Sequence, residues 1–312
     1  MADAGQAGAG GARYDRMGDD FDFQLYRYIP SLPAAIISVV VFAFLTTAHT
    51  WRLLSTRAFY FTAFTVGGLF ETIGYCGRIW GHYDKFSIGG FVIQAILILV
   101  APALFAASIY MILARLIRTL RAEHLSLIPV QWVTKIFVTG DVLSFSLQAG
   151  GGGIQSGGSL KLFEMGEKII VAGLFTQIVI FGFFVLTTVL FHRRLVRAPT
   201  PTLTQGVIPW KRHIFVLYAS STIILVRSVF RVVEYLQGNG GYLISHEVFL
   251  YIFDMLLMVA VMGIFLVWYI DDLESKPGRN KREESDRRVD SQDVMLEECD
   301  RIHKTHVLGS SM

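Results

Sequence analysis

The chain has 312 residues, of which 53% are hydrophobic and only 17% are charged, with a formal net charge of +3 at pH 7 and a mean hydropathy of +0.50. This composition lies outside the usual range of soluble domains and indicates an all-α polytopic membrane protein. We expect its partners to be membrane lipids and amphiphilic small molecules and not nucleic acid, and the oligomeric state is left open.

Seven stretches of the chain are long and apolar enough to cross a bilayer as helices. A hydrocarbon core about 30 Å thick requires roughly 20 residues per helix. The stretches cover residues 29–48, 59–79, 88–113, 130–149, 168–191, 214–236 and 247–270. The fourth is interrupted by Lys135, Asp141 and Gln148. The sequence therefore predicts a seven-transmembrane helix bundle over residues 28–271.

Lys and Arg residues are distributed unevenly between the two ends of the predicted bundle. Eighteen lie in the loops after spans one, three and five and in the C-terminal tail, whereas six lie on the opposite side. Because loops rich in Lys and Arg stay in the cytoplasm, we expect the polar segment 1–27 outside the cell and a disordered tail, 272–312, inside. Residues 1–27 lack the apolar core of a signal peptide.

Ionisable residues recur inside the predicted spans, each set on one helical face. The sets, spaced by three, four or seven residues, are Glu71 with Arg78, Asp141 with Gln148, Arg227 with Arg231 and Glu234, and Glu247 with Tyr251 and Asp254. A charged side chain at the bilayer centre costs about 2.5–3.5 kcal/mol, so such groups face the bundle interior and pair, or line a wet cavity. We expect the polar faces to converge on one outward-facing cavity.

Two of these sets favour a structural role. Arg227, Arg231 and Glu234 fit a clamp better than a substrate contact, because arginine binds carboxylates bidentately and holds helices in register. On the second span Glu71 and Arg78 lie two turns apart, and we expect them to pair with each other.

Two acids have no such local partner. Neither Asp141 nor Asp254 has a basic residue three or four positions away on its own helix, so a substrate-binding role and a structural role are equally open for each. The candidate substrate-binding residues are Asp141, Asp254, Glu71, Gln148, Gln177 and Tyr251. The expected structural ion-pair network is Arg78, Arg227, Arg231, Glu234 and Glu247.

Six ordered segments of the chain carry a family resemblance. They are "YIPSLPAA" at 28–35, "FETIGYCGR" at 70–78, "DVLSFSLQAGGGG" at 141–153, "GEKIIVAGLFTQ" at 166–177, "VRSVFRVVEYLQG" at 226–238 and "HEVFLYIFD" at 246–254. Together they resemble the motifs of the fungal lipid-translocating exporter family, also called the RTA-like family. The resemblance implies a multi-pass protein of the fungal plasma membrane that translocates or exports sphingoid long-chain bases and gives resistance to toxic amphiphiles.

A seven-span receptor or lipid sensor that acts indirectly on lipid traffic is the alternative function. The third predicted span ends without the acidic-Arg-aromatic triplet of familiar receptors, and the seventh lacks an Asn-Pro-X-X-Tyr motif. These absences favour the exporter interpretation over the familiar receptor classes.

The remaining motifs point away from catalysis. The glycine run "GGGIQSGG" at 151–158 lacks the Lys-Ser/Thr of a phosphate-binding loop, so we expect an external loop or a flexible lid. Four glycines at positions 67, 68, 74 and 77 are expected to allow close helix packing. His49 and His213 fall at the opposite end of the bundle from His82 and His246, so we expect no three-histidine metal site. The sequence contains neither a Gly-X-Ser-X-Gly nor a His-Glu-X-X-His motif, so we also expect no enzyme activity and no cofactor.

Overall fold

The computed structural model describes residues 31–84, 88–155, 160–198, 210–237 and 241–268, and every regular element in these ranges is helical. The elements are α1 (Leu32–Thr56), η1 (Phe59–Phe61), α2 (Thr62–Tyr83), α3 (Ile88–Thr119), η2 (Glu123–Leu125), α4 (Val130–Gln155), α5 (Leu160–Arg197), α7 (Trp210–Leu236), α8 (Tyr242–Ser245), α9 (Glu247–Leu250), η3 (Tyr251–Leu256) and α10 (Leu257–Val267). The expectations for segments 1–27 and 272–312 fall outside the described residues.

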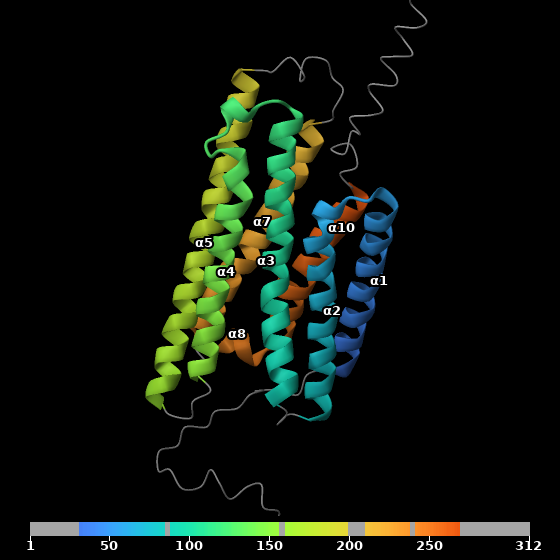
Figure 1. The fold of residues 1–312 in the computed structure, drawn as a ribbon. Coiled ribbons are helices and arrows are strands. Elements are labelled where there is room, and N and C mark those ends of the chain that lie inside the picture. The colour runs from blue at the N-terminus through green and yellow to red at the C-terminus, as the bar shows by residue number, and fades with distance from the viewer. Residues whose placement is uncertain (1–30, 85–87, 156–159, 199–209, 238–240, 269–312) are drawn as a thin grey trace, which may run out of the picture.

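The long helices form an antiparallel bundle with two lobes that meet at α3 and α7 (Figure 1). In one lobe α1 packs against both α2 and α10, and in the other α4 packs along α5. The helices α3 and α7 touch each other and contact both lobes. Polar groups carried by α2 and α10 are therefore separated from those carried by α4 and α5.

The outer surface of the bundle is apolar, as a lipid-facing surface requires. On α1, for example, Ile37, Val40 and Phe44 are exposed. Five helical stretches are long and apolar enough to cross a membrane: Leu32–Thr56, Val92–Thr119, Lys161–Arg197, Trp210–Leu236 and Glu247–Val267. The helices α2 and α4 fall short in the part of the chain described, because glycines and polar side chains lower their hydropathy. The all-helical expectation is confirmed there, and the seven-span count stays a prediction.

Several helices extend beyond the apolar stretches that predicted them. The first continues to Thr56 instead of stopping at residue 48, and α5 covers 38 residues instead of the predicted 168–191. Polar residues past the membrane core can still form backbone hydrogen bonds within a helix, so hydropathy marks the buried length and not the helix ends.

The expected loop or lid at the glycine run is wrong for its first residues. Glycines 151, 152 and 153 belong to α4, which ends at Gln155. A Cβ on Gly151 would lie 2.8 Å from the carbonyl oxygen of Gly166, and a Cβ on Gly166 would lie 2.5 Å from the carbonyl oxygen of Gly151. The two glycines therefore let the backbones of α4 and α5 touch, which is a packing role.

Close packing also explains the glycines of α2. A Cβ on Gly77 would lie 3.1 Å from backbone atoms of Gln94 and Gly90 on α3, and a Cβ on Gly74 would lie 2.7 Å from the side chain of Ile98. Gly68 instead faces Thr46 of α1 and Met262 of α10. The expected packing role of these glycines is confirmed, and it brings the charged face of α2 close to its neighbours.

The close contact between α4 and α5 generates a stability prediction. The substitution Gly166→Ala should lower stability by about 1–3 kcal/mol, because the added methyl group meets backbone atoms that cannot move without separating the helices. Gly150→Ala is the matched control, since a Cβ there has no neighbour within 4 Å and alanine favours a helix by up to about 1 kcal/mol over glycine. Thermal unfolding of the two variants in detergent measures the difference, and equal midpoints would contradict the packing role.

Candidate functional site

Four charged side chains form a buried cluster between α7 and the last span. We call Arg227, Arg231, Glu234 and Asp254 the Asp254 cluster. Nε of Arg227 lies 3.0 Å from Oδ1 of Asp254, and Nη2 of Arg231 lies 2.5 Å from its Oδ2. Arg231 also donates from Nη1 to Oε2 of Glu234 at 2.9 Å. The two positive and two negative charges balance, so no charge of the cluster is left uncompensated.

Arg227 also donates a hydrogen bond to a backbone carbonyl of α3 that lacks its usual helical donor. Pro102 lies inside this helix, and proline has no N–H to donate to the carbonyl four residues earlier. That carbonyl belongs to Ile98, and it accepts a hydrogen bond from Nη2 of Arg227 at 2.9 Å. One arginine therefore connects α3, α7 and the last span at the same depth.

Asp254 lies in an irregular part of the last span. Residues Tyr251–Leu256 form a π-helical turn, η3, between the short α9 and the regular α10. Insertions of this kind widen the helix and occur often at functional sites. The wider turn carries the carboxylate that both arginines contact.

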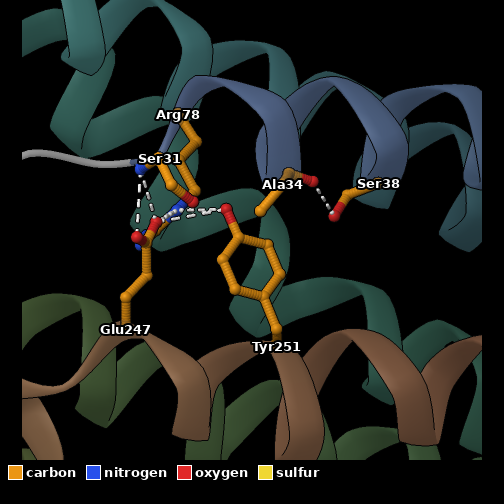
Figure 2. Close-up of polar contacts among 6 residues, drawn as sticks. All are labelled: Ser31, Ala34, Ser38, Arg78, Glu247 and Tyr251. Atoms are coloured by element: carbon orange, nitrogen blue, oxygen red, sulfur yellow. Dashed lines mark hydrogen bonds and ion pairs between the residues drawn. The ribbon is translucent and has the colours of Figure 1, made fainter.

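A second cluster closes one end of the same lobe. We call Ser31, Arg78, Glu247 and Tyr251 the Glu247 cluster (Figure 2). Oε1 of Glu247 lies 2.8 Å from Nη2 of Arg78 and accepts from the hydroxyl of Tyr251 at 3.2 Å. The backbone N–H of Ser31, the N-cap residue of α1, donates to both carboxylate oxygens at 2.9 and 3.0 Å. Glu247 thus ties the start of α1 to α2 and α9, at a helix N-terminus where negative charge is favoured.

One expectation about pairing is wrong. Arg78 binds Glu247, more than 160 positions away, and not Glu71 of its own helix. For Asp254, whose role the sequence left open, the partners are two arginines of α7. Residue spacing shows which side chains lie on the same face of one helix. It does not show which other helix packs against that face, so it could not identify these partners.

Glu71 is a buried acid without an ion-pair partner among the described residues. Its side chain is 1% exposed, and its Oε1 has no hydrogen-bond partner there. The hydroxyl of Tyr75, one turn along the same face of α2, is buried and unpartnered too. Ile98, whose carbonyl oxygen binds Arg227, packs its side chain against Gly74 between Glu71 and Tyr75, so the pair adjoins the Asp254 cluster.

Asp141 is the other acid that no arginine or lysine contacts within the described ranges. It lies in the second lobe, where its Oδ2 accepts a hydrogen bond from the hydroxyl of Tyr110 at 2.9 Å. The ring of Tyr110 packs against Phe137 and Phe184, so the surroundings are largely apolar. Lys135, expected among the embedded charges, is instead exposed and lies over the ring of Trp132.

The predicted glutamine candidates meet each other in the same lobe. Nε2 of Gln148 on α4 donates to Oε1 of Gln177 on α5 at 3.1 Å. The Oε1 atom of Gln148 is buried and has no partner in the described part of the chain. This pair lies two turns from Asp141 along α4.

The polar residues therefore form two separate groups instead of the single set that was expected. On α3, Ile98 receives Arg227 and Tyr110 reaches Asp141. These two positions are twelve residues apart, about 18 Å along a helix at 1.5 Å per residue. No hydrogen bond or ion pair between described residues of the two groups joins them, so the contacts do not support the expected common cavity.

Within the described ranges no three His, Cys, Asp or Glu side chains are grouped as metal ligands. A surface pocket of about 660 Å³ lies between the end of α3 and the start of α4, where it is lined by Arg118, His124 and Trp132 among others. No residue of either polar group lines it.

Two contributors to the site were missed in the sequence. Tyr110 gave no signal, because a tyrosine in an apolar span is most often a packing residue. Pro102 did give one, since a proline inside a span leaves the carbonyl four residues earlier without a donor, and a buried arginine is a suitable replacement.

Comparison with known proteins identifies the family. A family profile described as RTA1 like protein matches residues 64–275. The chain belongs to the RTA1-like family. This confirms the resemblance drawn from the sequence motifs, and with the apolar helices it makes the chain a multi-pass membrane protein.

Three relatives from Saccharomyces cerevisiae illustrate the range of the RTA1-like family. Protoporphyrin uptake protein 1 is 38% identical over 80% of this chain and 92% of its own length. Protein RTA1 is 36% identical over 78% of this chain and 84% of its own length. A sphingoid long-chain base transporter, RSB1, is 26% identical over 77% of this chain and 72% of its own length. No solved structure matches the chain.

The Asp254 cluster yields a prediction for this RTA1-like protein. The substitution Asp254→Asn should lower stability by about 3–5 kcal/mol, because it leaves two buried arginines without their shared carboxylate. Yield of monodisperse protein in detergent and its thermal midpoint measure the loss. Glu164→Gln on the exposed face of α5 is the control, and an Asp254→Asn midpoint equal to that of the control would show that the arginines need no acid there.

Proposed function

We propose that this protein translocates or exports amphiphilic lipids such as sphingoid long-chain bases across the plasma membrane and so gives resistance to toxic amphiphiles. Relatives named as a sphingoid base transporter and as a porphyrin uptake protein support transport of amphiphiles. In this proposal the protein has no catalytic activity and needs no cofactor.

The observation that carries the proposal is a pair of buried carboxylates without a basic partner. Glu71 and Asp141 lie in different lobes and at different depths, and no described arginine or lysine neutralises either one. A sphingoid base has an ammonium head next to a long apolar chain. A carboxylate attracts such a head strongly in an apolar medium, while the apolar helix faces accommodate the chain.

The other polar residues have supporting roles in this proposal. Gln148 and Gln177 lie two turns along α4 from Asp141, where their amide groups can bind the hydroxyls of the head. Asp254 and Tyr251, first considered as substrate ligands, are occupied by arginines and by Glu247, so we assign them to bracing the helices.

A second substrate class is favoured by the relative named protoporphyrin uptake protein 1. A porphyrin of this type is a large apolar ring with carboxylates, so an arginine would receive it better than an acid. Arg231, whose side chain is 14% exposed, is the most accessible arginine of the Asp254 cluster. Transport assays should therefore include both an amine and a carboxylate amphiphile.

The proposed architecture has seven spans with the N-terminus outside. The alternating direction of successive helices (Figure 1) and the excess of Lys and Arg at one end support it. A tag on the N-terminus should be accessible to antibody in intact cells, and a tag on the C-terminus only after permeabilisation. The reverse pattern would overturn the orientation, and two tags on the same side would overturn the odd number of spans.

Asp141→Asn tests the role of the second lobe. The variant should reach the membrane, because the amide still accepts a hydrogen bond from Tyr110. Loss of one charge-assisted contact, about 1.5–3 kcal/mol, should weaken binding of a sphingoid base roughly ten- to hundredfold. Uptake of fluorescent sphingoid base by vesicles containing the purified protein provides the measurement.

Glu123→Gln, an exposed change on η2, is the control for this experiment. Normal movement of the base in Asp141→Asn would contradict the assigned role. The receptor or lipid-sensor alternative would be favoured by two results together. Vesicles with the wild-type protein would move neither amphiphile, and cells that contain the protein would show a signalling response to the sphingoid base.

A further inference from the structure

The charges around Asp254 balance without Glu71. Arg227 and Arg231 supply two positive charges, and Asp254 and Glu234 supply two negative charges. The Glu247 cluster pairs its own arginine and acid. Glu71 is therefore the one buried acid of this lobe, among the described residues, that is left outside both clusters.

The surroundings of Glu71 offer little to a negative charge. From α7 the arginines 227 and 231 act on it electrostatically, but both already bind Asp254, whose negative charge on η3 opposes that of Glu71. Tyr75 follows on the same face of α2, and Phe42 of α1 stacks on its ring. From α3 the side chain of Ile98 packs against Gly74, between the two.

On this face of α2 two buried polar atoms have no hydrogen-bond partner within the described residues. They are Oε1 of Glu71 and the hydroxyl oxygen of Tyr75. Buried polar groups are nearly always hydrogen-bonded, so an unpaired set beside a balanced cluster indicates a site that is completed by something else. An ionised Glu71 would be buried without a donor at Oε1, whereas a protonated Glu71 adds no charge to the cluster.

We propose that Glu71 carries an exchangeable proton and releases it when the ammonium head of an amphiphile enters beside the Asp254 cluster. This inference rests on the proposed function and names the group that takes the head in the first lobe. The exchange is balanced: the carboxyl O–H bond breaks, the proton leaves to water, and the arriving ammonium replaces its charge. The net charge of the lobe is unchanged, so loading adds no buried charge, and the hydroxyl of Tyr75 gains a carboxylate to which it can donate.

Asp141 does not have the same properties. Its Oδ2 already accepts from Tyr110, and no arginine–carboxylate cluster adjoins it in the described structure. The π-helical turn further distinguishes the first lobe, because a widened turn at Asp254 can repack when the neighbouring charge changes. We therefore place proton exchange at Glu71 and not at Asp141.

The first test uses the wild-type protein in lipid vesicles. Infrared difference spectra on addition of sphingosine should show loss of the carbonyl band of a protonated carboxylic acid, and ¹³C-labelled glutamate should shift that band. Glu71→Gln should abolish the difference band, and the exposed control Glu164→Gln should retain it. An unchanged carboxylic acid band in wild-type protein that binds sphingosine would overturn the inference.

The second test follows fluorescent sphingoid base in vesicles with and without a pH gradient. A gradient should accelerate movement by the wild type and by Glu164→Gln, and the acceleration should be lost in Glu71→Gln. Equal acceleration in wild type and Glu71→Gln would overturn proton exchange at this residue while leaving the transport function intact. Wild-type protein that moves no base in either condition would instead overturn the proposed function itself.

Discussion

Local neutralisation of buried charge is the constraint on which this structure depends. In an apolar bundle each ionised side chain must find an opposite charge or a strong donor, and Asp254 meets this requirement with two arginines from one neighbouring helix. One of those arginines also binds the carbonyl that Pro102 leaves free on α3. The same few atoms thus hold three helices at one depth, and the π-helical turn at Asp254 places its carboxylate at their junction.

Backbone proximity is the second condition for this arrangement. The glycines of α2 let it approach α3 so closely that a methyl group at Gly77 would press on backbone atoms, and Gly151 and Gly166 do the same for α4 and α5. Helices in lipid gain little from burying apolar side chains against one another, so van der Waals contact between backbones supplies much of their attraction. The resulting hairpins carry the polar residues of the two lobes and keep them apart.

The separation of the lobes gives the RTA1-like protein two acids with different surroundings. Glu71 adjoins a balanced ion-pair cluster, whereas Asp141 lies among aromatic rings with one tyrosine donor. That donor, Tyr110, lies about 18 Å along α3 from Ile98, which binds the cluster. In the proposed function an amphiphile with a charged head is received at two depths, which suits movement across a membrane better than retention at one site. The relatives named for protoporphyrin uptake and for sphingoid base transport are the reason to test heads of both charges.

The sequence by itself determined the all-helical membrane character, the family and most of the buried charged residues, although it wrongly placed Lys135 among them. Hydropathy and helical spacing depend only on residues near one another in the chain, and the motif at 226–238 already contained both arginines of the Asp254 cluster. Only the tertiary structure decided which acid each arginine binds, because Arg78 and Glu247 are brought together by the packing of separate helices. It also decided that Glu71, and not Asp254, is the acid of the first lobe without an ion-pair partner among the described residues, and that the glycines at 151–153 continue a helix. Both outcomes depend on which side chains and backbone atoms the neighbouring helix places opposite these residues.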